Sequence, residues 1–266
     1  MQRHVKIKPT HGWRVGCALC VLLFCLAASR GISAAAESDI GEVEKGSPTQ
    51  IEDAYPLGYR ELDIEGLFRY ERLNQKRRYV YSPRIEYGLA PNWQIRLTAQ
   101  LFTGTADVSE SGNLQIEVLR NLTMESRWMP ALAISAVGDF PTGHAAHGID
   151  TTLKLLASKA LGTSTSRPQV HLNFTWTHHG GRPTTERSEL YGVVVGYSRL
   201  LTAQMMLVAD YFHQQLPLAG RTEDVIEAGF RRALSKTVVV ALGAGYGLNN
   251  DSRDFHIQTS IEVSFR

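Results

Sequence analysis

The feature that most constrains the fold is a strict alternation of apolar and polar residues, which recurs in short segments along the chain. In residues 93–101 the sequence W-Q-I-R-L-T-A-Q-L places apolar side chains at every odd position and polar ones between them. Residues 170–177 and the final segment, 255–265, repeat the pattern. Successive side chains of a strand point to opposite faces, so the alternation predicts β-strands with one apolar face and one polar face.

We predict about twelve such strands, most of them close to the ~9–11 residues that a tilted strand needs to cross a bilayer. Their ranges are 60–71, 79–89, 93–103, 112–121, 130–140, 150–159, 168–178, 189–200, 203–214, 222–233, 236–247 and 254–265. From the second strand onward, short connections (90–92, 202–203, 235–236) alternate with longer polar ones (103–111, 142–148, 179–188). An even strand number with short turns on one side is typical of an all-β, transmembrane, antiparallel up-and-down β-barrel.

The alternative is a soluble β-sandwich or a soluble barrel, which also alternates. The number and length of the strands favour the membrane barrel, as do the Leu, Ile, Val, Ala and Phe residues on most apolar faces. Aromatic residues near the predicted strand ends suggest interfacial girdles: Tyr87, Trp93, Trp176, Tyr197, Tyr246 and Phe265.

The N-terminus predicts export. Residues 1–14 are basic, residues 15–28 are apolar without charge, and residues 29–36 are small and mostly polar, which is the pattern of a secretory signal peptide. The alternative, a membrane-anchoring helix, is disfavoured because the apolar run is shorter than the ~20 residues of a span. Residues 37–58 are acidic and polar, with Gly and Pro. We therefore predict a signal peptide over 1–36, a flexible periplasmic leader over 37–58 and a barrel in the bacterial outer membrane over 59–266.

Composition excludes several classes of function. The three cysteines, Cys17, Cys20 and Cys25, all lie in the predicted signal peptide, so the processed chain has no disulfide framework and no Cys-based metal site. A net charge of +2 gives no indication of nucleic-acid binding. The basic cluster at 76–78 is interpreted as a solvated loop. No cofactor is predicted. The alternating Gly243, Gly245 and Gly247 suit close packing in a strand and not a glycine-rich loop that binds a nucleotide.

The polar faces carry charges of both signs, and we expect them to line the lumen. About twelve strands enclose a space between that of filled eight-stranded barrels and that of open porins. Paired charges would either lock a narrow, plugged lumen or frame a selective aqueous path. A loop at Pro141, Thr142 and Gly143 would either fold over the barrel mouth or remain an ordinary surface loop. The predicted lumen-lining residues are Glu61, Asp63, Glu65, Arg84, Glu86, Arg96, Glu117, Lys154, His171, Glu227, His256 and Glu262.

Two kinds of chemistry are weighed and not favoured. A lipid-modifying enzyme would need a Ser/His/Asn arrangement on adjacent strands, but no serine has matching spacing beside His213 or beside His178 and His179. His178 and His179 could converge with His144 and His147 as metal ligands, although solvated loop histidines are the plainer interpretation. We therefore predict no catalytic residue and no metal.

Three motifs resemble a known family over roughly residues 60–266. Residues 84–93 (RIEYGLAPNW) resemble that family's strand-turn-strand "EYGLTDRLEL". Residues 139–143 (DFPTG) resemble its "LPTG", and residues 158–162 (SKALG) its "SKPLG". The family comprises outer-membrane proteins labelled for the MetA pathway of phenol degradation. The resemblance implies a barrel channel or transporter, with aromatic or other hydrophobic compounds as cargo, and it supplies no catalytic residue.

The chain's ending resembles the C-terminal strand by which bacterial outer-membrane proteins are recognised for assembly, although Arg266 follows the aromatic Phe265. The expected partners are outer-membrane lipid and lipopolysaccharide, the assembly machinery and a small-molecule solute, with no nucleic acid. The expected function is passive passage of small solutes, including hydrophobic or aromatic ones. The alternatives are a lipid-modifying enzyme and a non-conducting structural or sensing barrel, which a lumen sealed by ion pairs would indicate.

Overall fold

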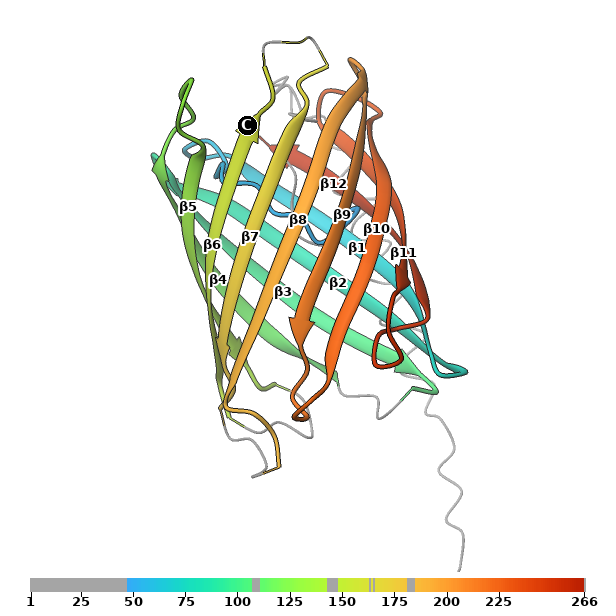
Figure 1. The fold of residues 1–266 in the computed structure, drawn as a ribbon. Coiled ribbons are helices and arrows are strands. Elements are labelled where there is room, and N and C mark those ends of the chain that lie inside the picture. The colour runs from blue at the N-terminus through green and yellow to red at the C-terminus, as the bar shows by residue number, and fades with distance from the viewer. Residues whose placement is uncertain are drawn as a thin grey trace, which may run out of the picture. The chain divides into compact units, whose positions relative to one another are not determined.

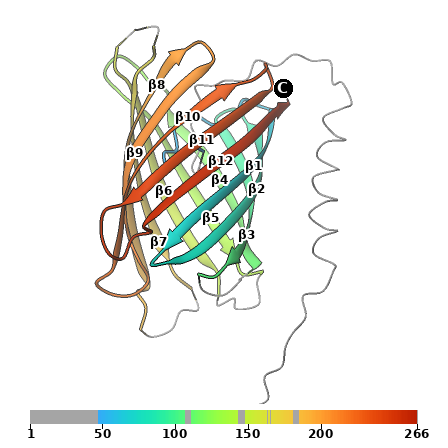
Figure 2. The ribbon, with the colours of Figure 1, turned by 90° about the vertical axis from the view of Figure 1, so that its right-hand side faces the viewer.

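The computed structural model describes residues 47–106, 111–142, 148–162, 164, 166–180 and 185–265, which belong to one compact unit, Ala36–Arg266. They form a closed antiparallel barrel in which each strand pairs with its neighbours in sequence (Figures 1 and 2). The all-β, twelve-stranded fold is therefore confirmed. The strands are β1 Leu62–Leu73, β2 Lys76–Ala90, β3 Trp93–Gly104, β4 Ser111–Thr123, β5 Ala131–Phe140, β6 Asp150–Ala160, β7 Gln169–His178, β8 Glu189–Thr202, β9 Met205–Gln215, β10 Thr222–Ala233, β11 Val238–Gly247 and β12 Phe255–Phe265.

The barrel closes through β1 and β12, which pair from Leu62 opposite Phe265 to Arg72 opposite Phe255. Closure leaves no sheet edge, so backbone groups that would be unpaired in hydrocarbon are satisfied by the neighbouring strand. None of the described segments forms an apolar helix of membrane-spanning length.

The two ends of the barrel differ in their connections. We call the end that holds the C-terminus (labelled in Figure 1) the turn end, because β2–β3, β8–β9 and β10–β11 join there through short turns. The opposite end, the loop end, carries five longer connections and one tight hairpin, β1–β2, whose turn residues Asn74 and Gln75 both have positive φ. Two connections of similar length, residues 124–130 and 161–168, lie at the turn end and depart from the rule. Short turns face the periplasm in outer-membrane barrels, which makes the loop end extracellular.

The distribution of side chains is the reverse of that in a soluble domain. The outward faces expose large apolar residues, such as Ile85 (45%) and Leu155 (53%), whereas inward charged residues such as Glu86 (1%) are buried. Soluble proteins almost never bury so many charges beneath an apolar surface. The outward apolar band therefore faces lipid, and the predicted outer-membrane location is confirmed.

The structure corrects the prediction of a flexible leader over 37–58 where those residues are described. Residues 47–58, here called the leader segment, lie inside the barrel, and Ser47, Thr49, Ile51, Ala54 and Leu57 are each at most 3% exposed. The segment (blue in Figure 1) crosses the lumen, from beside the β2–β3 turn to the inner faces of β10–β12. Its polar composition resembles that of a disordered chain because its partners are polar side chains of the inner wall.

Candidate functional site

The backbone of the leader segment is bound by side chains of the inner wall. Asn173 on β7 acts as a clamp on Glu52: its amide oxygen accepts from the Glu52 N–H (2.9 Å), and its amide nitrogen donates to the Glu52 carbonyl (2.6 Å). Asp210 on β9 accepts from the N–H groups of Gln50 (2.8 Å) and Ile51 (3.0 Å). These peptide groups of the leader are thus hydrogen-bonded by side chains of the wall, as a buried backbone requires.

Further clamps hold the half of the segment nearest β1. Gln94 accepts from the N–H of Leu57 (2.9 Å). Ser158 accepts from the N–H of Ala54 (3.1 Å), and Asn121 donates to the carbonyl of Ala54 (2.7 Å). These contacts come from β3, β4 and β6, so the leader segment is held by strands that are distant in sequence.

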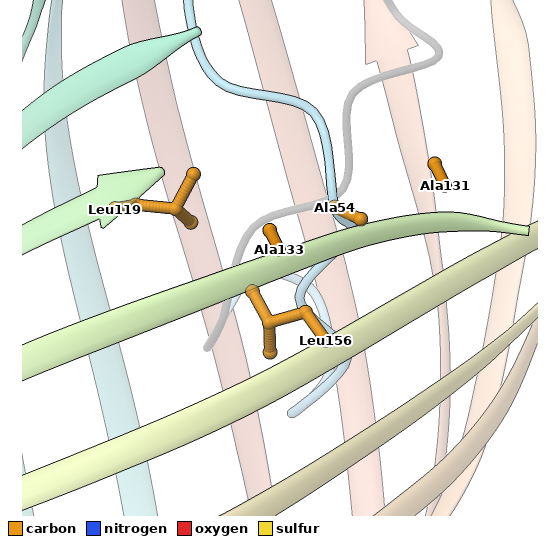
Figure 3. Packing of buried hydrophobic residues seen from close by; sticks show 5 residues of the cluster. All are labelled: Ala54, Leu119, Ala131, Ala133 and Leu156. Carbon is orange, nitrogen blue, oxygen red and sulfur yellow. The ribbon is translucent and has the colours of Figure 1, made fainter. Parts of the chain in front are cut away.

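Apolar side chains of the leader segment fit two apolar patches on the inner wall. Ala54 packs with Leu119, Ala131, Ala133 and Leu156, and Figure 3 shows these side chains gathered where the leader passes β4–β6. Burial of these groups contributes to docking at roughly 25 cal/mol per Å² of apolar surface removed from water.

The second patch binds Ile51, which packs with Met206 and Val208 on β9. Two glycines make room for this part of the leader. A Cβ on Gly196 would lie 2.2 Å from Cδ1 of Ile51, and a Cβ on Gly243 would lie 2.3 Å from the Pro48 carbonyl oxygen. Gly243 therefore permits a close approach of two backbones, which explains the small inner face of β11.

The leader carboxylate Glu52 completes a buried charge cluster, which we call the Glu52 network: Glu52, Glu86, Arg96, Glu117 and Lys154. Lys154 donates to Glu52 (2.7 Å) and to Glu117 (2.8 Å). Arg96 contacts Glu52, Glu86 (2.8 Å) and Glu117 (2.9 Å). Buried charges of this kind are tolerated only when they are paired and hydrogen-bonded, so Glu52 and the wall cations stabilise one another in place.

A second cluster, the Arg253 network, lies toward the loop end and comprises Arg69, Glu71, Arg78, Glu223 and Arg253. The guanidinium of Arg253 contacts Glu71 (3.0 Å) and binds both carboxylate oxygens of Glu223 (2.7 and 3.1 Å). Arg69 and Arg78 also contact Glu71, which is fully buried. Arg253 belongs to the β11–β12 connection, so this connection folds into the barrel mouth.

At the turn end the leader segment is tied to the β4–β5 connection. The Tyr55 hydroxyl donates to Glu125 (3.1 Å), which also accepts from Lys159 (2.9 Å) and from the N–H of Ala160 (2.9 Å). Partial burial raises the pKa of Glu125, but the three hydrogen bonds outweigh it and hold that pKa below its usual range. Burial, and then the charge of Glu125, raises the pKa of Tyr55. The link therefore joins a carboxylate and a neutral phenol at neutral pH.

The structure places most of the predicted lumen residues on the inner wall. Arg84 pairs with Glu65 (2.9 Å) on the neighbouring strand β1, as expected, and also with Glu86 (3.5 Å) on its own strand. Four other pairings or positions were not predicted individually. Asp63 is buried, Arg231 pairs with Glu262 (3.0 Å), His256 lies 3.0 Å from Glu227, and His171 lies between Ser158 (3.0 Å) and Ser198 (2.9 Å).

Glu61 differs from the other predicted residues because it precedes β1 at the turn end. Its carboxylate accepts from the N–H of Gly58 (3.0 Å) and so caps the leader segment instead of lining the lumen. At the loop end Pro141 follows β5, and Thr142 donates to the carbonyl of Gly112 (2.7 Å). Gly143 lies outside the described residues.

A serine and a histidine on adjacent strands do occur, although not at the histidines considered from the sequence. Ser158, His171 and Ser198 on β6–β8 are each at most 2% exposed and face the lumen beneath Ala54. They do not reach the lipid face, where a lipid-modifying enzyme would need them. The described residues contain no group of three metal-ligating side chains, and His144 and His147 lie outside the described part.

A polar cavity of about 140 Å³ lies on the loop-end side of the leader segment. Gln50 lines it, so the leader forms part of its boundary. The wall supplies cations, amides and hydroxyls: Arg69, Ser82, Arg84, Arg96, Thr98, Gln100, Gln115, Thr152 and Lys154, together with Glu117, Leu67 and Val137. A cavity of this size holds a few waters or one small solute.

Sequence reasoning missed Glu52, Asn173 and Asp210 as parts of the site. One signal was present: Ile51, Ala54 and Leu57 recur at a spacing of three within an otherwise polar stretch. A second signal was the unusually small inner face of β11, which leaves space for another chain segment.

Comparison with known proteins places the fold among outer-membrane barrels. No protein-family model and no curated protein sequence matches the chain. A solved COG4313 outer membrane channel from Pseudomonas putida F1 is similar, with 13% identity over 84% of this chain and 100% of that chain, at a TM-score of 0.61.

The NanC porin (10% identity) and the KdgM porin (7%) each have a TM-score of 0.54, and each comparison covers 77% of this chain and 99% of the porin. Identities this low show a shared fold alone. The COG4313 outer membrane channel shares the barrel fold that the family resemblance implies, so that resemblance is supported at the level of the fold alone.

Proposed function

We propose that this protein is an outer-membrane channel for small solutes, and that the leader segment closes its lumen. The observation that carries the proposal is the mode of leader binding. The segment is held by side chains such as Asn173 and Lys154 and adds no strand to the barrel. Its removal would leave the twelve-stranded wall intact and would open a polar path from the cavity to the turn end.

The lumen chemistry favours polar cargo. The cavity wall is dominated by charged, amide and hydroxyl groups, whereas the apolar patches of the inner wall are covered by Ile51 and Ala54. The family resemblance suggests hydrophobic or aromatic cargo, and such a solute would have to replace these leader side chains on their patches. We therefore propose small polar solutes as the main cargo, and no catalytic reaction.

Single-channel recording in planar bilayers tests this proposal. The processed chain should give small or rare conductance steps, and a variant lacking residues 47–57 should give larger and longer ones. In that shortened background, Arg96→Glu should shift ion preference toward cations. The matched control is Arg120→Glu, because Arg120 is exposed on the outer wall and lies over the Trp93 ring. Silence of both the processed and the shortened chain would overturn the channel.

A second candidate is a non-conducting structural or sensing barrel. The observation that favours it is the density of ion pairs across the lumen, in which both the Glu52 network and the Arg253 network are buried. In that case the shortened chain would remain silent even though its heat-dependent gel migration shows a folded barrel.

A further inference from the structure

The outward faces of β1 and β2 carry a pair of arginines directly above an aromatic cluster. On β2 the outward residues from Tyr79 to Leu89 bear no charge, and the next outward residue toward the loop end is Arg77. On β1 the outward face is likewise free of charge from Leu62 to Tyr70 and ends at Arg72. The strand register sets Arg72 opposite Arg77. Two cations therefore lie side by side where the apolar band ends.

The rings beneath them form a contiguous aromatic surface. The ring centroid of Tyr70 lies 5.4 Å from that of Tyr79 and 5.8 Å from that of Phe255. The ring centroids of Tyr79 and Phe68 are 6.3 Å apart. Aromatic residues in such barrels gather at the level of the lipid headgroups. Arg72 and Arg77 are the next outward residues beyond this level, which places their guanidinium groups among headgroups.

Other outward polar pairs at this border are complementary. His178 on β7 contacts Glu189 on β8 (2.8 Å), and His213 on β9 contacts Asp224 on β10 (2.7 Å). Like charges directly across two strands are unfavourable unless an anion lies between them. Among the described residues, Arg72 makes a long ion pair with Asp254 (3.7 Å), in which the Arg72 side chain stays 50% exposed. The pair thus keeps excess positive charge at the lipid border.

We propose that Arg72 and Arg77 form a binding site for the phosphate group of a lipid A molecule in the outer leaflet. Guanidinium groups bind phosphate through paired, charge-assisted hydrogen bonds. The acyl chains would lie along the rings of Tyr70, Tyr79 and Phe68. The basic stretch 76–78, interpreted from the sequence as a solvated loop, is thereby divided, because Arg78 points inward to Glu71 and Arg77 points outward to lipid.

Binding of fluorescent bis-phosphorylated lipid A to the barrel in zwitterionic vesicles tests the site. The double variant Arg72→Gln/Arg77→Gln should bind about tenfold more weakly or worse, which corresponds to ~1.4 kcal/mol or more. Arg120→Gln, an outward arginine near the turn end, should bind as the parent does. Arg77→Gln alone avoids disturbing the Arg72–Asp254 contact and should show a smaller loss in the same direction. Heat-dependent gel migration verifies that each variant is folded.

Three outcomes would overturn the site. The folded double variant would bind lipid A as the parent does, or dephosphorylated lipid A would bind the parent equally well. Alternatively, millimolar inorganic phosphate would displace lipid A completely, which would identify free phosphate as the ligand. Conduction measurements do not enter this test, so the site stands or falls independently of the channel.

Discussion

The Glu52 network and the Arg253 network cross the lumen with the same kind of buried ion pairs, but they differ in how one of their charged residues is attached. Arg253 comes from a connection fixed at both ends by β11 and β12, and Asp254 next to it donates its N–H to the Arg72 carbonyl (2.8 Å). Glu52 comes from a segment that precedes β1 and is joined to the wall strands from one side only. Under the proposed function, the first arrangement is a permanent part of the wall and the second is removable. Whether a buried ion pair can open therefore depends on how the segment that carries one of its residues is joined to the barrel.

The largest effect on stability is expected for Arg253→Ala. The substitution removes the guanidinium that binds both oxygens of Glu223, and one of the cations that contact Glu71. Both carboxylates lie on barrel strands, so neither can move into water. The free energy of unfolding in urea should fall by about 3–5 kcal/mol, because a buried charge loses its partner. Arg221→Ala is the control: Arg221 is exposed and 3.7 Å from Asp251, so less than ~1 kcal/mol is expected. Equal losses in the two variants would contradict the comparison.

Lys154→Ala should have a smaller effect on stability than Arg253→Ala and a larger effect on solute access to the lumen. Glu52 and Glu117 would then share only Arg96, but the leader can withdraw Glu52 into water. We expect a loss of about 1–3 kcal/mol in the free energy of unfolding. Larger conductance steps should accompany it. Lys236→Ala, which removes an exposed lysine from the β10–β11 turn, should leave conductance unchanged. A loss as large as that of Arg253→Ala would indicate that the leader is not removable.

Gly243→Ala tests the leader without changing any charge. The new methyl group would meet the Pro48 carbonyl at 2.3 Å, so the leader backbone must move away, at a cost of about 1 kcal/mol. Thr49→Cys provides the readout, since the other cysteines all lie in the predicted signal peptide. Thiol labelling at this buried position should be several-fold faster when Gly243→Ala is added than in Thr49→Cys alone. In Gly66→Ala the nearest atom is 3.7 Å away, so labelling should stay slow. Equal labelling rates would contradict the close approach.

The smallest effect is expected from pH at the turn end. The pKa of Glu125 is depressed in the folded protein, so its contribution to leader binding is complete above the usual glutamate pKa of about 4.3. It is lost only as pH falls through the lower folded pKa. The labelling rate of Thr49→Cys, corrected for the reagent's own pH dependence, should rise slightly in acid. The free energy of leader docking should fall by less than ~1 kcal/mol. Glu125→Gln should abolish this rise, and an unchanged rise would assign it to another group.

The alternation of residues predicted the strands, their order and the barrel, because period two is a local property of each segment. It also predicted the inward positions of Arg84, Arg96 and Glu117, since a strand fixes which face each side chain takes. The role of the leader segment was not predictable in this way. Glu52 and Lys154 are 102 residues apart, and the clamp residues Asn173 and Asp210 look like any other polar wall positions. Only the closed barrel brings them around one peptide.

Asn173, Ser158, Gln94 and Asp210 contact the peptide groups of the leader segment, and such groups are present whatever side chains the segment carries. Positions that the wall contacts only through their peptide groups are expected to vary during evolution, in contrast to Ser47, Ile51, Glu52, Ala54 and Tyr55, whose side chains contact the wall. Among homologous proteins the wall residues should be retained while the stretch they hold diverges. Engineers could then substitute a foreign peptide there as long as the acidic residue and the side chains that pack on the inner wall keep their places.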